Sequence, residues 1–188
     1  MQKIFAFCGK MGAGKDTLVA LTSETLNIQV ATSFTTRPKR GGEKEGREYF
    51  FISKEDFLNK RETGEIAEYT SYNVATGDTW YYGLTKEELE KSQPIITIVN
   101  PDGLKQLEKI YGDRVISIII DCSDIERLKR AINREKNVNT LEVCRRMCQD
   151  DKDFKNILCD YIVDNSDGNM KTALKEIEKI ITIECMYQ

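Results

Sequence analysis

The chain has 188 residues, of which 28 are basic and 31 acidic, so its formal net charge is −3. This length predicts one domain with a sizeable core and small insertions, and the slightly acidic balance lacks the broad positive field of a general nucleic-acid binder. The chain contains no histidine, which excludes every catalytic or zinc site that requires one. No apolar run approaches the about 20 residues of a membrane span, and Met1–Lys3 does not resemble a signal peptide. We therefore expect a soluble cytoplasmic protein that binds neither nucleic acid nor membranes.

Four short apolar runs predict buried strands of a parallel sheet, because they do not alternate strictly with polar residues. These runs are Ile4–Cys8, Ile95–Val99, Val115–Ile120 and Tyr161–Val163. Apolar residues at helical spacing predict helices over Thr17–Thr25, Gly103–Tyr111 and Ile125–Arg134, and a last helix with an apolar stripe from Met170 to Ile181. Strands that alternate with helices in this way predict an α/β fold with a parallel sheet.

Two segments depart from this alternation. Residues 33–83 are rich in charge, Gly, Tyr and Thr, with short β-like pieces, and predict a small inserted subdomain. Residues 127–154 are highly polar and predict a helical flap. The core is then expected to comprise residues 1–32, 84–126 and 155–188.

The six cysteines form no CxxC pair. We expect reduced, mostly buried thiols. Cys144 and Cys148 lie four residues apart without a second ligand pair nearby, which favours core packing over metal binding.

A glycine-rich loop follows the first strand and precedes a helix. It reads Gly9-Lys10-Met11-Gly12-Ala13-Gly14-Lys15, which is the GxxxxGK pattern in its required context. The glycines allow backbone N–H groups to turn toward a phosphate, the helix N-terminus adds its positive end, and Lys15 supplies a point charge. The next residues are Asp16 and Thr17, although a hydroxyl that ligates magnesium is expected directly after the lysine. The loop predicts phosphate binding without specifying the reaction.

A second phosphate site is predicted by an arginine and tyrosine cluster. Arg37 and Arg40 stand three residues apart, and Tyr49 follows nearby. Guanidinium groups form paired hydrogen bonds with dianionic phosphates. A solvated charged loop is the alternative interpretation of this run.

Together these motifs resemble the guanylate kinase family. The resemblance is carried by the Thr-Thr-Arg-x-x-Arg-x-Gly-Glu run at 35–43, the Gly-Arg-Glu-Tyr-Phe-Phe run at 46–51, Gly64–Tyr69, Tyr81-Tyr82-Gly83 and Tyr161–Asn165. It extends from the phosphate loop almost to the end of the chain. It implies a P-loop NTPase-type parallel sheet flanked by helices, with an inserted monophosphate-binding subdomain and a mobile lid. It also implies an enzyme that phosphorylates GMP or dGMP with ATP and Mg²⁺.

The resemblance assigns roles residue by residue. Arg37, Arg40, Tyr49 and Tyr82 would hold the phosphate of the monophosphate, while Ser33 and Glu68 would face its base. Arg134 and Arg146 resemble lid arginines that close over the transferring phosphoryl group, and Arg130 is a weaker candidate for that role. Asn165 resembles the residue near the adenine of ATP. Phosphoryl transfer needs positioned cations rather than histidine, so this assignment agrees with the composition.

Several positions depart from the family pattern. Leu84 stands where a small hydroxyl residue usually helps to read guanine, and Ile98 and Asn100 replace two aspartates. The link over residues 69–81 is longer than usual. The predicted phosphate grip is therefore intact, whereas the base pocket is altered.

The departures leave two alternatives open. One is a nucleoside monophosphate kinase of shifted or broader base choice, because the Gly14-Lys15-Asp16-Thr17 run also resembles some deoxynucleoside monophosphate kinases. The other is a non-catalytic guanylate kinase-like protein-binding module, which typically loses the loop lysine or the lid arginines. Lys15, Arg134 and Arg146 are all present here, which favours catalysis; the oligomeric state is not predicted.

Asp16 offers a replacement for the missing metal ligands. Mg²⁺ prefers oxygen ligands in octahedral geometry, and this carboxylate could bind it directly or through a water molecule. Capping of the following helix is the alternative role.

Overall fold

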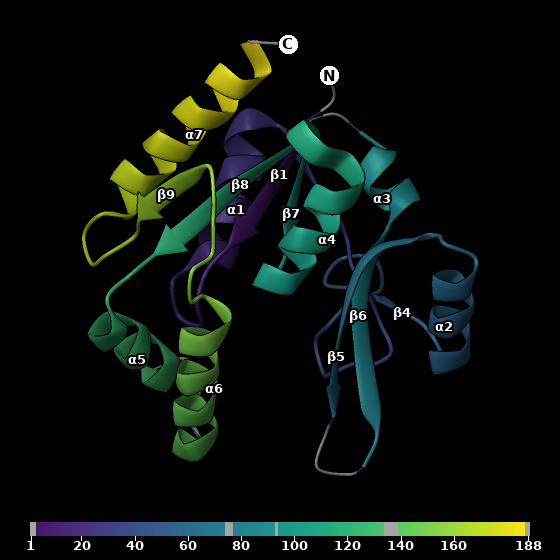
Figure 1. Cartoon of the computed structure of the whole chain (residues 1–188). Coiled ribbons are helices and arrows are strands. Elements are labelled where there is room, and N and C mark those ends of the chain that lie inside the picture. Colours follow the sequence, from purple (N-terminus) through teal and green to yellow (C-terminus); the bar gives the residue numbers. More distant parts are fainter. Residues whose placement is uncertain (1–2, 74–76, 93, 134–138, 187–188) are drawn as a thin grey trace.

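The computed structural model describes residues 3–73, 77–92, 94–133 and 139–186. Its centre is a five-stranded parallel sheet with the strand order β2-β7-β1-β8-β9 (Figure 1). The strands are β1 (Ile4–Cys8), β2 (Gln29–Val30), β7 (Ile95–Ile98), β8 (Val115–Asp121) and β9 (Tyr161–Asp164). In the central register, Ile4 lies opposite Ile95 of β7 and Val115 of β8. The strands predicted from the apolar runs are confirmed, with ends that differ by at most one residue.

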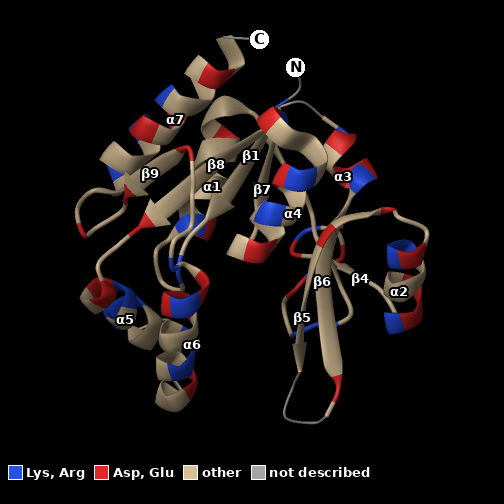
Figure 2. Cartoon of the chain, in the orientation of Figure 1, with Lys and Arg blue, Asp and Glu red and all other residues tan. Residues whose placement is uncertain are grey.

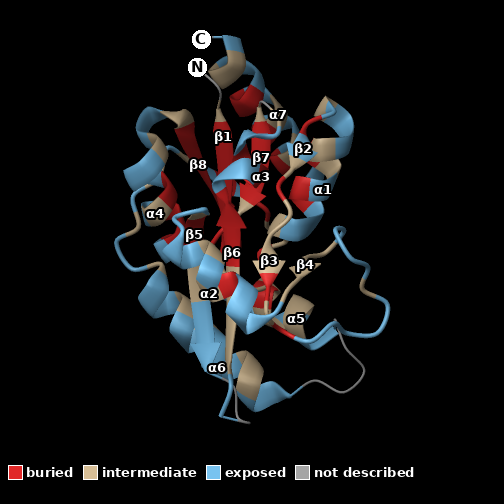
Figure 3. Ribbon diagram, turned by 90° about the vertical axis from the view of Figure 1, so that its right-hand side faces the viewer, coloured by how far each residue is buried: buried red, intermediate tan, exposed pale blue. Residues whose placement is uncertain are grey.

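Helices cover both faces of this sheet. They are α1 (Lys15–Leu26), α3 (Lys86–Glu90), α4 (Pro101–Tyr111) and α7 (Met170–Met186), with a short 3₁₀ turn at Gly112–Arg114. Side chains alternate along a strand, so Phe5 and Phe7 pack in the hydrophobic cluster that includes α1 and α7, while Ala6 packs in the cluster that includes α4. Figure 3 shows this central sheet as the most deeply buried part of the chain.

A second, four-stranded sheet has the order β4-β3-β6-β5. It comprises β3 (Phe34–Thr35), β4 (Phe50–Phe51), β5 (Ile66–Asn73) and β6 (Thr79–Thr85), and helix α2 (Lys54–Glu62) packs against it. Phe57 of α2 is fully buried and stacks on Tyr81 of β6, with ring centroids 5.3 Å apart. This small sheet thus has a core of its own.

Two helices, α5 (Asp124–Asn133) and α6 (Thr140–Asp153), form a separate arm. In Figure 1 this arm and the small sheet both extend from the end of the molecule toward which the parallel strands run. Both helices carry basic and acidic residues (Figure 2).

The apolar residues whose spacing predicted α5 do not form its buried face. Ile125 is 69% exposed and Ile132 is 43% exposed, whereas Arg127 is buried. No residue of α6 is buried, and both Cys144 and Cys148 are exposed. The prediction that these two cysteines pack in the core is therefore wrong, because α6 lies outside the core. No helix in the described ranges combines the length and apolar character that crossing a membrane requires.

Candidate active site

The phosphate loop connects β1 to α1. Gly12 and Gly14 have φ angles of 80° and 89°, in the left-handed region that residues with a Cβ rarely adopt. A Cβ on Gly9 would lie 2.9 Å from the carbonyl oxygen of Ile120 in β8. The loop thus requires glycine both for its turns and for its close approach to the neighbouring strand.

The helix after the loop begins at Lys15. Its N-cap is Gly14, and no side chain caps it by a hydrogen bond. Asp16 lies exposed in the first turn. Its carboxylate is therefore not used in capping, and its charge contributes to raising the pKa of Tyr49 in the small sheet, although burial is the main cause of that shift.

Asn165, directly after β9, contacts the phosphate loop. Its Nδ2 donates to the carbonyl oxygen of Ala13 at 2.7 Å, and the residue is 2% exposed. Its Oδ1 is buried without a hydrogen-bond partner among the described residues. Arg130 of α5 donates to the carbonyl oxygen of Asn165 at 2.9 Å and makes longer bonds to the carbonyls of Gly12 and Ala13. A buried acceptor without a partner is costly, and a ligand donor that reached this atom would offset that cost.

The second cluster centres on Arg37, which is buried and lies two residues after β3. Its two terminal nitrogens donate to the two carboxylate oxygens of Glu43 at 3.0 and 2.8 Å. Its guanidinium lies 5.4 Å from the ring centre of Tyr49, and the rings of Tyr49 and Tyr82 are 5.7 Å apart. The structure thus brings three of the four predicted phosphate-binding side chains together.

Glu43 also connects Arg40 to this cluster. Its Oε2 accepts a hydrogen bond from the backbone N–H of Arg40 at 2.7 Å, and Arg37 with this N–H lowers the pKa of Glu43 to about 2. The guanidinium of Arg40 is exposed. Glu43 belongs to the quoted motif, but sequence reasoning gave it no role; its contact with both arginines is a signal that only the fold supplies.

Glu68 of β5 is 6% exposed. Burial raises the pKa of its carboxyl to about 7, although a hydrogen bond from the backbone of Leu84 opposes the shift. A Cβ on Gly103 of α4 would lie 2.7 Å from Glu68 Oε2, so a larger residue there would displace this carboxylate. Ser33, the other residue predicted to face the base, is half-buried just before β3.

The altered positions surround the same region. Leu84 is fully buried, and the side chain of Asn100 caps α4 by accepting from the N–H of Gly103 at 2.7 Å. Leu84 has no polar side-chain group, and the side-chain oxygen of Asn100 is used in this cap. A leucine and an amide thus stand near Glu68 where the family pattern implies a hydroxyl and a carboxylate.

Of the two principal lid arginines, only Arg146 is described, and its hydrogen bond and ion pair are to Glu142 rather than to either cluster. Arg146 of α6 is 57% exposed and its Nε donates to Glu142 at 2.8 Å. Arg134 lies outside the described residues. The arm does contact the loop elsewhere: Asp150 of α6 accepts a hydrogen bond from the N–H of Met11 at 2.7 Å, and Arg127 is buried beside it. Sequence reasoning missed both residues, because a polar run gave no sign that one of its arginines is buried.

These clusters lie at one edge of the main sheet. Gly9, Asn100 and Asn165 directly or closely follow β1, β7 and β9, and residues 31–33 follow β2. The carboxyl ends of parallel strands share an edge, where open α/β sheets bind ligands.

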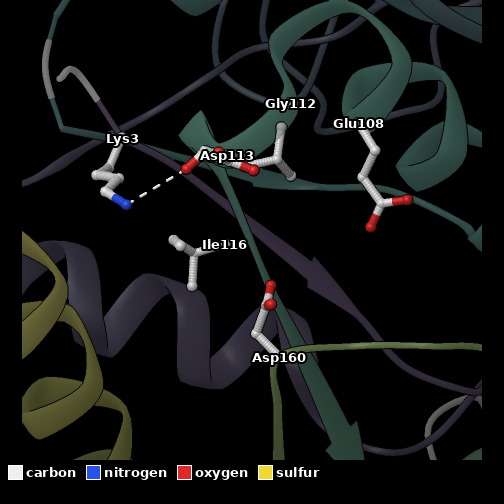
Figure 4. Close-up of a pocket in the computed structure, with 7 residues that line it drawn as sticks. Lys3, Glu108, Gly112, Asp113, Ile116 and Asp160 are labelled. Atoms are coloured by element: carbon white, nitrogen blue, oxygen red, sulfur yellow. Dashed lines mark hydrogen bonds between the residues drawn. The ribbon is translucent and has the colours of Figure 1, made fainter.

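A hollow at the opposite edge does not take part in this arrangement. It is lined by residues that include Lys3, Glu108, Asp113 and Asp160 (Figure 4). Lys3 donates to the carbonyl oxygen of Asp113 at 3.3 Å, and Asp160 accepts from the hydroxyl of Ser117 at 2.7 Å. Lys3 and Asp160 therefore serve to join elements of the fold.

Comparison with known proteins agrees with this geometry. Residues 1–184 match the family "Guanylate kinase". A guanylate kinase of Clostridioides difficile is 36% identical over 182 residues, covering 94% of this chain and 85% of that protein. One of Porphyromonas gingivalis is 31% identical, covering 96% and 97%. "Guanylate kinase 2, chloroplastic/mitochondrial" of Oryza sativa is also 31% identical, but this chain spans only 64% of its length.

A solved structure gives the same result. The crystal structure of guanylate kinase from Anaplasma phagocytophilum superposes with a TM-score of 0.71 at 25% identity, covering 98% of this chain and 88% of that one. The parallel sheet and the loop after β1 define a P-loop nucleotide-binding protein. Within that class, the chain belongs to the guanylate kinase family. The alternatives of a shifted monophosphate kinase or a protein-binding module are not favoured.

Proposed function

We propose that the chain transfers the γ-phosphoryl group of ATP to GMP or dGMP, producing ADP and GDP or dGDP. A phosphate oxygen of the monophosphate attacks the γ-phosphorus, and the bond from this phosphorus to the β–γ bridging oxygen breaks. The observation that carries the proposal is that the phosphate loop directly follows β1, and that the small sheet with the Arg37 cluster extends from the same end of the parallel strands (Figure 1). We also propose that the reaction takes place in the cytoplasm, where both nucleotides are available.

The donor site is formed by the loop Gly9–Lys15 with Asp16, Thr17 and Asn165. Lys15 and the loop amides would neutralise the charge on the β- and γ-phosphates. The unpartnered Oδ1 of Asn165 is an acceptor that the exocyclic amine of adenine could satisfy. This match supports ATP as the donor.

The acceptor phosphate is assigned to Arg37, Arg40, Tyr49 and Tyr82. Glu43 fixes the guanidinium plane of Arg37 through two hydrogen bonds, so little rotamer entropy is lost when the phosphate binds. The Arg37 guanidinium also packs against the ring of Tyr49. This rigid cation would hold the monophosphate for attack.

Ser33 and Glu68 are assigned to the base. Guanine offers two donors, N1–H and the exocyclic amine, to the buried carboxylate of Glu68, whereas adenine offers an acceptor at N1. A carboxylate left without donors costs about 1–3 kcal/mol. Because Leu84 supplies no polar group and the side-chain oxygen of Asn100 caps α4, discrimination should rest mainly on Glu68.

The arm and the small sheet are proposed to move during the reaction. Arg146 and Arg134, in a lid spanning residues 127–154, would approach the transferring group only after the lid closes over the subdomain at 33–83. Closure would exclude water that could otherwise hydrolyse ATP. The pairing of Arg146 with Glu142 is consistent with a lid that is open.

Divalent metal use is general in this family, and we propose Mg²⁺ near Asp16. The ion would neutralise charge on the ATP phosphates. The described residues contain no cluster of three or more acidic, cysteine or histidine ligands, so Asp16, phosphate oxygens and water are the expected ligand set. The exposed Asp16 carboxylate, free of capping, fits that role.

A magnesium titration tests the role of Asp16. Asp16→Ala should raise the magnesium concentration needed for half activity and lower kcat, and Asp16→Ser should partly restore both. Unchanged magnesium dependence together with lower thermal stability would instead indicate a structural role.

The activity itself is tested by separating the products formed from ATP and GMP. We expect ADP and GDP in equal amounts. Lys15→Ala should lose about 3–4 kcal/mol of transition-state stabilisation, and Arg37→Ala should chiefly raise KM for GMP. Lys39→Ala, in the same loop as Arg37, is the control and should retain activity. Normal kinetics in the Lys15 or Arg37 variant would contradict the proposal.

A further inference from the structure

Arg127 is an unusual residue for a polar helix, because only 1% of its side chain is exposed. Its Nε donates to the carbonyl oxygen of Met11 at 2.9 Å, and one terminal nitrogen donates to Asp150 at 2.8 Å. The other terminal nitrogen pairs with Asp124. A guanidinium stays charged when buried, so these partners are what offsets its removal from water.

Asp150 completes a closed arrangement around Met11. The Oδ2 atom that accepts from Arg127 also accepts from the backbone N–H of Met11 at 2.7 Å. The amide N–H and the carbonyl of one loop residue are therefore both held by a single ion pair. One member of that pair lies on α5, and the other lies in the last turn of α6.

The next loop residue also touches α5. A Cβ on Gly12 would lie 2.6 Å from the carbonyl oxygen of Arg127 and 3.0 Å from its Cα. The loop backbone thus packs directly against the helix at the residue whose side chain holds Met11.

We propose that Arg127 and Asp150 are positioning residues that hold the phosphate loop in the conformation that binds ATP and connect it to α6. The inference rests on the proposed function, since it concerns the donor site. Displacement of α6 would separate Asp150 from both partners, leaving Arg127 buried with fewer partners and Met11 free to reorient. Loop conformation and helix position are therefore energetically linked.

A neighbouring contact provides a matched control. Lys10 Nζ and Asp151 Oδ1 are 2.6 Å apart and also connect the loop to α6. However, Asp151 is 58% exposed, and surface pairs of this kind contribute little. Asp151→Ala should therefore leave ATP binding unchanged.

The experiment compares Asp150→Ala, Arg127→Leu, their double variant and Asp151→Ala in the full chain. Calorimetric titration gives Kd for ATP without an acceptor, thermal denaturation gives the midpoint, and steady-state kinetics gives KM for GMP. We expect each single variant to raise Kd for ATP about tenfold, as for loss of a hydrogen bond to a charged group. KM for GMP should stay near the wild-type value.

The double variant separates positioning from stability. Removing both charges should restore much of the thermal midpoint lost in Asp150→Ala, while Kd for ATP stays raised because Met11 is no longer held. In hydrogen-exchange measurements, ATP should slow exchange of the backbone amides of α6 in the wild type but not in Asp150→Ala. Normal ATP binding in both single variants, or joint recovery of midpoint and Kd in the double variant, would overturn the inference. A wild-type chain that forms no GDP would instead refute the proposed function.

Discussion

The acceptor cluster depends on a carboxylate that is not itself expected to touch the phosphate. Glu43 holds both terminal nitrogens of Arg37 and the backbone of Arg40. Two positive side chains and one negative one leave a net positive site with a fixed geometry. Such a partner orients the cation without cancelling its attraction for a dianion.

Replacing Glu43 should therefore harm acceptor binding selectively. Glu43→Gln retains one acceptor oxygen but loses the paired interaction, so we expect KM for GMP to rise about 5- to 30-fold with KM for ATP unchanged. Steady-state kinetics checks this result. Glu65→Gln, which loses an exposed pair with Lys60, is the control; equal effects of the two substitutions would contradict the role of Glu43.

Glu68 links base recognition to the pH dependence of stability. Its pKa is raised from 4.5 to about 7 by burial. Between these two pH values the folded chain therefore keeps a proton on Glu68 that the unfolded chain has released. Its contribution to stability is fully present below pH 4.5 and is lost as the pH rises through about 7. The full loss is on the order of 3 kcal/mol.

The measurement is denaturant unfolding of the wild type and Glu68→Gln at pH 5 and pH 8. Glutamine does not ionise, so the variant should lose less stability over this range than the wild type. Glu108, whose pKa is also raised by burial, is common to both proteins and cancels in the comparison. Identical pH dependence in the two proteins would show that Glu68 is not the titrating group.

At the scale of elements, the contact between the phosphate loop and α5 gives a test of packing. Gly12 and Gly42 both have positive φ angles, 80° and 86°. A Cβ meets the Arg127 backbone at the first position and nothing within 4 Å at the second. Gly42→Ala should cost about 1–2 kcal/mol for the backbone conformation alone.

Gly12→Ala should cost about 1–3 kcal/mol more than Gly42→Ala, because the loop or the helix must move. Urea unfolding of both variants gives the difference. Equal destabilisation would mean that α5 yields freely and does not restrain the loop.

The sequence predicted the elements whose burial is complete. Ile4–Cys8 and Val115–Ile120 are apolar on both faces, which only a covered parallel strand requires. The β5–β6 hairpin was not predicted as two strands, because most of its residues are not buried and many are Tyr or Thr. The apolar spacing correctly predicted that α5 is a helix. It did not indicate which face is buried, because Arg127 is buried in an ion pair with Asp150 while Ile125 is exposed.

The candidate site could likewise be predicted only in part. The loop and the arginine motif could be predicted because their chemistry depends on local spacing. Glu43, Arg127 and Asp150 could not, because their partners come from distant segments that only the fold brings together. The roles of Arg134, Arg146 and Asp16 remain predictions that need a bound nucleotide.

At the scale of the whole molecule, the arm and the small sheet extend from the same end of the parallel strands (Figure 1). This arrangement predicts that the molecule becomes more compact when nucleotides bind. If the lid and the small sheet close on two bound nucleotides, an inhibitor that joins adenosine and guanosine through phosphates should lower the radius of gyration. Small-angle scattering with and without this inhibitor measures the change. Superimposable curves at saturation would contradict closure.

The central claim is that this chain phosphorylates a guanine nucleotide. The most direct test is ADP release measured with each nucleoside monophosphate at saturating ATP and magnesium. The account predicts that GMP or dGMP has the highest kcat/KM and that the value for AMP is lower. Leu84 and Asn100 should make this ratio smaller than is usual in the family, and Glu68→Gln should reduce it further. A preference for AMP, or no turnover with any monophosphate, would contradict the account.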